Sequence, residues 1–311
     1  MQADRTSAAA SSAAVAYGRR PKTAAEAYGP RPMTAAEAYG PRPMTATLVC
    51  ARDRCRHDGH MTTPEPLSYD AALHEGGRLY PGTRIGRPGR ARTYWATIAA
   101  MRALRLRLDV DVVGSDNVAP GPTILVGNHV SAMDPVVAVM SHWWRVTAFA
   151  KVEVFERRGA VFFRLMGQIP LRRGDEASTT WALDMASRTL ADGGKVGLYP
   201  EGTRSPDHRT MHRLHKRVLI PVLQANPAVP VHAITTVYGA RRRGRTPVTV
   251  RISPPLAVDA PTMTPDEVTR LVTEALIELG GLEYRDAYAR DVKAGRELDG
   301  RTWDELPTVP G

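Results

Sequence analysis

The fold of this chain is decided by the stretch Thr123-Ile124-Leu125-Val126-Gly127-Asn128-His129-Val130-Ser131-Ala132-Met133-Asp134-Pro135. Its first four residues form an apolar run, which predicts a fully buried strand. Asp134 directly before Pro135 is typical of a helix start, because Asp caps free backbone N–H groups and Pro suits the first helical position. The stretch therefore predicts a strand, a sharp turn and a helix.

His129 and Asp134 both lie in this turn. Histidine is the side chain most easily used as a general base near neutral pH. A carboxylate five positions later can fold back over the turn and hold the imidazole in one tautomer. The alternative is structural: Asp134 caps the helix and His129 is an ordinary loop residue. These two residues alone leave both interpretations open.

Apolar strands alternate with helices on both sides of this turn. Strands are expected at 104–112, 147–151, 195–199, 229–237 and 248–252, and helices at 94–103, 135–142, 155–166, 177–191 and 265–280. The last helix opens with a capping box, Thr264-Pro265-Asp266-Glu267. This alternation predicts an α/β fold whose sheet is covered by helices.

The composition limits the class of protein. The chain has 311 residues, a formal net charge of +10 and 2 Cys. The charge favours polyanions or anionic lipid headgroups as partners, and two Cys give no disulfide framework, as expected in a reducing compartment. No apolar run reaches the length of a transmembrane helix, and the first residues contain no apolar core of a secretory signal. We expect a protein that lies on a membrane rather than spanning it.

The two ends of the chain differ from its middle. Residues 1–92 carry an eleven-residue repeat, marked by Tyr17, Tyr28 and Tyr39, and are rich in Gly, Pro and Arg, so we expect a disordered, basic, low-complexity tail. Its residues Cys50, Cys55, His57 and His60 could bind zinc, but their spacing matches no common zinc finger. Residues 291–311 are also expected to be flexible, which leaves one domain at 93–290.

Two apolar segments have two interpretations each. The helix at 93–103 combines Trp95 with flanking Arg92 and Arg102, which suits a membrane interface but also a helix that packs on its own domain. The stripe that includes Phe162 and Phe163 suits the core of the domain, or a wall that holds an acyl chain.

Polar loops follow three of the predicted strands, at 128–134, 171–174 and 201–205. Ligands of α/β sheets bind where strands end in such loops. Arg173 and Arg204 can donate paired hydrogen bonds to phosphate oxygens, although a surface ion pair is the alternative for each. Gly202 allows a tight turn with exposed amides, Thr203 adds a hydroxyl, and Glu201 can orient an arginine or accept from a substrate hydroxyl.

These motifs resemble four ordered blocks of the glycerolipid acyltransferases, and most closely those of the 1-acyl-glycerol-3-phosphate acyltransferases. The blocks are Asn128-His129-x4-Asp134, Gly167-x5-Arg173, Glu201-Gly202-Thr203-Arg204 and Val229-Pro230-Val231. The resemblance runs from about residue 94 to 252, and the order of the blocks is far more specific than His-x4-Asp alone. It implies an α/β fold with a glycerolipid-acyltransferase-type mixed sheet covered by helices.

The resemblance also implies roles for individual residues. His129 would take the proton from the free hydroxyl of a lysophospholipid, and Asp134 would orient His129. Substrate would be held by Asn128, Lys151, Arg173, Glu201, Gly202, Thr203 and Arg204, with Val229-Pro230-Val231 near the acyl or acceptor channel. The co-substrate would be acyl-CoA or acyl carrier protein, with no metal and no other cofactor. The expected location is the cytoplasm, on the inner face of the cell membrane, against its anionic surface.

Departures from the family pattern leave alternatives open. A Gly-Lys-x-Gly-like stretch of the family is replaced by Arg213-Leu214-His215-Lys216-Arg217, so the acceptor could instead be glycerol-3-phosphate or a lyso-aminolipid. A basic binding protein for nucleic acid or membrane is a second class, but the chain shows no motif for reading nucleic acid, so no nucleic-acid partner is expected. A hydrolase with Ser131 as nucleophile would lack the Gly-x-Ser-x-Gly elbow.

Overall fold

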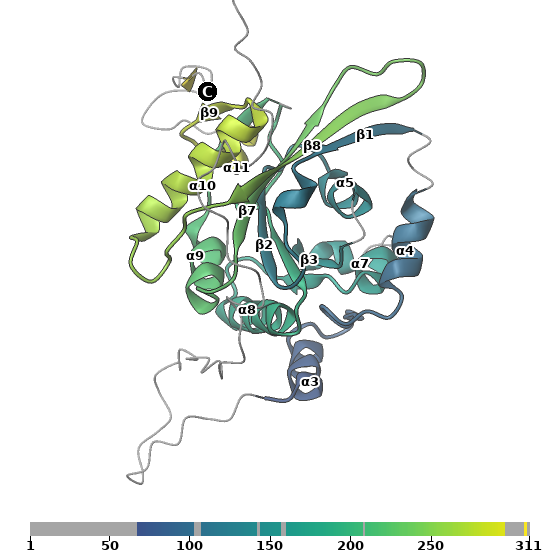
Figure 1. Cartoon of the computed structure of the whole chain (residues 1–311). Helices are drawn as coiled ribbons and strands as arrows, with labels where there is room; N and C mark the ends of the chain where they lie inside the picture. Colours follow the sequence, from purple (N-terminus) through teal and green to yellow (C-terminus); the bar gives the residue numbers. More distant parts are fainter. Residues whose placement is uncertain are drawn as a thin grey trace, which may run out of the picture. The chain divides into compact units, whose positions relative to one another are not determined.

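The computed structural model describes a domain built around a seven-stranded sheet (Figure 1). The described residues are 67–102, 107–141, 144–156, 160–207, 209–295 and 308–309. The strands of the sheet, in spatial order, are β1 (Leu108–Val113), β8 (Thr246–Pro255), β7 (Val231–Tyr238), β2 (Thr123–Gly127), β5 (Lys195–Leu198), β3 (Val146–Lys151) and β4 (Ile169–Leu171).

The sheet is mixed, as the resemblance implied. Neighbouring strands are parallel throughout, except that β7 and β8 are antiparallel. The carboxyl ends of β7, β2, β5, β3 and β4 therefore lie at one edge of the sheet. The loops that follow β2, β4 and β5, which carry the predicted site residues, start at this edge.

Helices cover both faces of the sheet (Figure 1). One face is covered by α8 (Glu176–Ala191), α9 (Lys216–Ala225) and α10 (Pro265–Gly280), and α3 (Tyr69–Leu79) packs on α8. The other face is covered by α4 (Tyr94–Met101), α5 (Asp134–Ser141) and α7 (Ala160–Leu165). The short helices η2 (Ser115–Asn117) and α6 (Val152–Glu156) complete this part of the chain.

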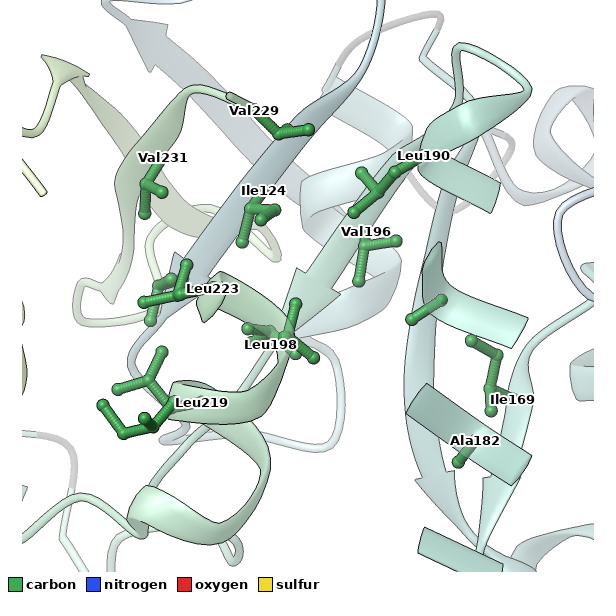
Figure 2. Packing of buried hydrophobic residues seen from close by; sticks show 14 of the residues in the cluster. Ile124, Ile169, Ala182, Leu190, Val196, Leu198, Leu219, Leu223, Val229 and Val231 are labelled. Carbon is green, nitrogen blue, oxygen red and sulfur yellow. The ribbon is translucent and has the colours of Figure 1, made fainter. Parts of the chain in front are cut away.

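The apolar run of β2 is explained by burial on both faces. Ile124 and Val126 point into the core under α8 and α9, whereas Leu125 points into the core on the other face. Figure 2 shows Ile124 beside Val196 of β5, close to Leu223 of α9. Each such fully buried aliphatic side chain contributes about 1.5–3 kcal/mol, so an uninterrupted apolar strand is favoured here.

The predicted helix at 265–280 is confirmed together with its capping box. The Thr264 hydroxyl accepts from the Glu267 N–H, and the Glu267 carboxylate accepts from the Thr264 N–H. Gly281 ends the helix in a left-handed conformation, with φ of 59°. Elsewhere the boundaries differ: β1 begins at Leu108, and the helix expected at 155–166 is divided into α6 and α7.

The expectation of a disordered tail through residue 92 is wrong for 67–92. The Tyr80 hydroxyl contacts Ser178 Oγ at 2.6 Å and donates to the Pro170 carbonyl, and Trp181 Nε1 donates to the Ala72 carbonyl at 2.7 Å. Composition concealed this contact because α3 reaches the core through a few Tyr and Ala residues among Gly and Arg. The repeats, Cys50, Cys55, His57 and His60 lie outside the described residues.

The expectation of a flexible tail from residue 291 is also wrong for 291–295. A three-stranded sheet has the order β10 (Thr308–Val309), β9 (Glu283–Arg285) and β6 (Thr210–His212). Its strand β9 is followed in the chain by helix α11 (Ala289–Lys293). Val292 and Asp291 of α11 are buried. The elements β6, β9 and α9 were not predicted, because two of them are three residues long and Pro221 interrupts the pattern of the third.

Helix α4 packs on its own domain, which is one of the two interpretations that the sequence left open. Tyr94 and Ile98 are fully buried against the domain, whereas Trp95 is 39% exposed. No helix among the described residues is long and apolar enough to cross a membrane.

Candidate active site

His129 and Asp134 meet in the turn between β2 and α5. His129 Nδ1 lies 3.0 Å from Asp134 Oδ2, which also accepts the backbone N–H groups of Val130 at 2.8 Å and Ser131 at 2.7 Å. Asp134 is completely buried, while the His129 side chain is 20% exposed. A carboxylate held by two backbone donors is a fixed acceptor for Nδ1–H, which leaves the lone pair on Nε2 toward substrate.

Tyr238, at the end of β7, completes the surroundings of Asp134. Its hydroxyl donates to Asp134 Oδ1 at 2.8 Å. Burial, and next the charge of Asp134, raise the pKa of Tyr238 well above its ordinary value, so its phenol stays protonated and remains a donor. Both oxygens of Asp134 are thus hydrogen-bonded, one by the turn after β2 and the other by the end of β7.

Glu201 holds the loop of His129 by hydrogen bonds to the backbone. Its Oε1 accepts the His129 backbone N–H at 2.8 Å, and its Oε2 accepts the His212 backbone N–H at 3.2 Å. The Ser205 N–H also donates to the His129 carbonyl, at 2.6 Å. Through these hydrogen bonds Glu201, which is 1% exposed, joins the loops after β2 and β5 to β6. These contacts position the backbone of His129.

Asn128 is also a positioning residue. It is 1% exposed, and its side-chain amide pairs with the backbone of Thr236: the Thr236 N–H donates to Oδ1 at 3.0 Å, and Nδ2 donates to the Thr236 carbonyl at 3.4 Å. This pair extends the contact between β2 and β7 by one residue beyond the ladder. It fixes the start of the turn that carries His129.

Three cations from neighbouring loops converge beside this turn. Lys151 ends β3, Arg173 follows β4 and Arg204 follows β5, and all three are exposed. Partial burial, and next the charges of Arg173 and Arg204, lower the pKa of Lys151. Within the described part of the chain none of the three makes an ion pair, so the alternative of surface ion pairs is not supported. Such a group of like charges suits an anionic ligand.

Gly202 and Thr203 lie within this cationic group. Gly202 has φ of +69°, and a Cβ built there would lie 3.7 Å from Arg173 Nη2. The left-handed turn keeps the loop backbone close to the arginine, as glycine permits. Thr203 is half-buried beside it.

An apolar cavity lies next to Tyr199, whose ring contacts His129. It has a volume of about 40 Å³, and its lining includes Leu125, Pro135, Phe162, Phe163, Met166 and Tyr199. The Tyr199 ring lies 4.8 Å from the His129 ring, centroid to centroid. One wall of the cavity, the Tyr199 ring, thus contacts the imidazole.

A family model and two known proteins match parts of this chain. The family model described as Acyltransferase matches residues 109–237. Less than half of the chain is thus similar to an acyltransferase domain. A curated relative, the 1-acyl-sn-glycerol-3-phosphate acyltransferase of Borreliella burgdorferi, is 27% identical over 100 residues, which are 32% of this chain and 40% of that protein. The match thus spans less than half of the relative's length.

A solved structure with similarity to part of this chain is the 1-acyl-sn-glycerophosphate (LPA) acyltransferase PlsC from Thermotoga maritima. It is 26% identical, with a TM-score of 0.44, and the match covers 58% of this chain and 79% of that one.

One of the four sequence blocks lies away from the His129 turn. Val229 and Val231 are buried in the core at the start of β7, whereas the His129 turn adjoins the other end of this strand, at Tyr238. Eight residues of strand span roughly 25 Å, so this block lies far from His129, and its place near a substrate channel stays a prediction. Pro230 instead accepts a backbone hydrogen bond from Ile124.

Ser131 is not arranged as a nucleophile. Its Oγ accepts the Met133 N–H at 3.1 Å, and its own N–H donates to Asp134. No described contact joins Ser131 Oγ to the His129 imidazole, so the hydrolase alternative has no support. Among the described residues, no three His, Cys, Asp or Glu side chains form a group that could hold a metal ion.

Two residues at the site were not predicted. Tyr199, directly after β5, and Tyr238, the last residue of β7, contact the His129–Asp134 pair. They are separated from it by long stretches of sequence, so no local pattern indicates them. Each lies at the carboxyl end of an apolar strand, which is the one signal that could have found them.

Proposed function

We propose that this chain transfers a fatty acyl group from a thioester to the free hydroxyl of 1-acyl-glycerol-3-phosphate, giving phosphatidic acid. The observation that carries the proposal is the 3.0 Å contact between His129 Nδ1 and Asp134 Oδ2. The acceptor phosphate suits the cations, and the apolar lining beside Tyr199 suits an acyl group, for which the cavity of about 40 Å³ has to widen. The Borreliella burgdorferi relative is named for the same acceptor, which supports this choice.

The proposed chemistry needs one base and no nucleophile from the protein. His129 Nε2 takes the proton of the acceptor hydroxyl while the hydroxyl oxygen attacks the thioester carbonyl carbon. The tetrahedral intermediate then collapses, the C–S bond breaks, and the thiolate of CoA or carrier protein takes the proton from the imidazolium. Asp134 stabilises the imidazolium, and Tyr238 keeps Asp134 in place. The proposal includes no metal and no further cofactor.

Two other acceptors have the same class of chemistry. Glycerol-3-phosphate carries the phosphate but no acyl chain, and a lyso-aminolipid carries a chain with a different headgroup. The grouping of Lys151, Arg173 and Arg204 favours the acceptor with a phosphate monoester. A role in binding nucleic acid is disfavoured, because these cations surround a general base instead of forming a stripe.

An acceptor panel tests the proposal. The purified full chain is incubated with acyl-CoA or acyl carrier protein and, in turn, with lysophosphatidic acid, glycerol-3-phosphate, a lyso-aminolipid or monoacylglycerol, and products are identified by mass spectrometry. We expect phosphatidic acid to form fastest. Product from none of the acceptors, or faster acylation of a lipid without phosphate, would contradict the proposal.

We also propose that the domain contacts the inner face of the cell membrane through α4 and α7. Trp95, Val161 and Leu165 are exposed by 39%, 49% and 37%. The Thr93 hydroxyl donates to the Leu165 carbonyl and joins the two helices. Arg92 and Arg164 line a hollow beside them. Apolar side chains rimmed by arginines suit an anionic membrane surface.

Vesicle sedimentation tests this contact. The double variant Trp95→Ser, Val161→Ser should bind vesicles of phosphatidylglycerol and phosphatidylcholine about fivefold more weakly or worse, because less apolar area enters the interface. Val113→Ser is a matched control, since Val113 is 52% exposed on β1. Equal loss with the control variant, or no loss with the double variant, would contradict the proposal.

A further inference from the structure

Helix α11 lies outside the segment that matches the acyltransferase family, yet it adjoins the loop of Gly202. The His215 ring stacks on the Tyr288 ring with centroids 4.4 Å apart and an interplanar angle of 2°. The other side of this imidazole approaches the loop, because His215 Cδ2 lies 2.8 Å from where a Cβ at Gly202 would be. Tyr288 is the N-cap of α11, so the His215 ring lies between the start of this helix and the loop of Gly202.

Several contacts hold α11 in this position. The Arg213 guanidinium donates to both carboxylate oxygens of Asp286, each at 2.8 Å, and its backbone N–H donates to the Ala287 carbonyl at 3.0 Å. The parallel pairing of β6 with β9 lies directly before these contacts in both segments. The helix is therefore a fixed part of the domain next to the site.

Arg290 and Lys293 bring two more cations to the same group. Both are exposed, on consecutive turns of α11. Partial burial, and next the charges of Arg204 and Lys151, lower the pKa of Lys293. Partial burial also lowers the pKa of Arg173, and Arg290 acts in the same direction. The nearest acid to Arg290 is its neighbour Asp291, at 3.6 Å, and Lys293 makes no ion pair among the described residues.

We propose that Arg290 and Lys293 belong to the acceptor site and bind its phosphate monoester together with Arg173 and Arg204. The inference rests on the proposed function and extends its site beyond the family segment. Among the described residues, the five cations Lys151, Arg173, Arg204, Arg290 and Lys293 outnumber the three acids that act on them, Glu153, Glu201 and Asp291. A dianion placed among them offsets the repulsion that remains. A monoester carries up to two negative charges and a diester one, so added cations favour the monoester.

Steady-state kinetics on the full chain test the proposal. Arg290→Ala and Lys293→Ala should each raise the KM for lysophosphatidic acid about threefold, and the double variant about tenfold, with kcat within twofold of wild type. The variant Lys293→Arg keeps the positive charge, so its KM for lysophosphatidic acid should equal that of wild type. Arg270→Ala is the matched control, because Arg270 is an exposed arginine of α10 paired with Glu274. Equal melting temperatures verify that the variants are folded.

Three results would overturn the proposal: an unchanged acceptor KM in the double variant, a rise in the KM for acyl-CoA instead, or an equal rise for monoacylglycerol, which has no phosphate. Calorimetry with glycerol-3-phosphate separates this inference from the proposed function. Weaker binding of glycerol-3-phosphate by the double variant supports the phosphate site even if wild type transfers no acyl group. Equal binding by wild type and double variant contradicts it.

Discussion

At the scale of single residues, Asp134 is the centre of the site. It accepts hydrogen bonds from the imidazole of His129, from two backbone N–H groups and from Tyr238. The sequence left open whether Asp134 caps a helix or orients His129. The structure supports the second role: Asp134 is the first residue of α5, and its two backbone donors, Val130 and Ser131, lie in the turn before the helix rather than in its first turn.

Removing the phenol of Tyr238 tests this arrangement. Tyr238→Phe leaves Asp134 Oδ1 buried without its described donor, which costs about 1–3 kcal/mol of stability. We expect kcat to fall about tenfold while the acceptor KM stays within twofold, because the hydroxyl acts on Asp134 and not on substrate. Tyr69→Phe is the control, because it also removes one buried hydroxyl, at a position distant in sequence from the site. This hydroxyl donates to the Pro88 carbonyl. An unchanged kcat in Tyr238→Phe would contradict this account.

The site could be predicted from sequence only as far as its contacts are local. His129 and Asp134 are five positions apart, so one turn brings them together. Asn128 and Glu201 were recognised by position, but their task as positioning residues depends on pairing with Thr236 and His212 across strands. Such pairing leaves no local pattern, and the same reason conceals Tyr238.

At the scale of elements, α3 shows why composition misjudged the start of the domain. Gly76 faces the Trp181 indole of α8: a Cβ there would lie 2.4 Å from Trp181 Cζ2. Gly77, one position later, has no heavy atom within 4 Å of the same construction. A glycine-rich segment was interpreted as a tail, although one of its glycines is required for close packing.

These two glycines make a matched pair of substitutions. Gly77→Ala should raise the free energy of unfolding by about 0.5–1 kcal/mol, because alanine favours a helix more than glycine does. Gly76→Ala should lower it by about 1–3 kcal/mol, because Trp181 must move. Thermal unfolding of both variants measures the difference. A stabilising effect of both would contradict the packing of α3 on α8.

At the scale of the whole molecule, the sheet was predictable because its strands are apolar and separated by amphipathic helices. The strand β2 alternates its contacts between two cores, and α10 carries a complete capping box. Strand order, the burial of Val229 and Val231 in the core, and the approach of α11 to the site depend on long-range contacts. The segments 67–92 and 291–295 became part of the domain for the same reason.

The central claim is that His129 is the base that activates a lipid hydroxyl. Its most direct test compares wild type with His129→Ala at equal concentration, with lysophosphatidic acid and acyl-CoA, and measures the initial rate of phosphatidic acid formation by mass spectrometry. The account predicts product from wild type and a rate about 10²–10⁴-fold lower from His129→Ala, with an unchanged melting temperature. Equal rates from both proteins would contradict it.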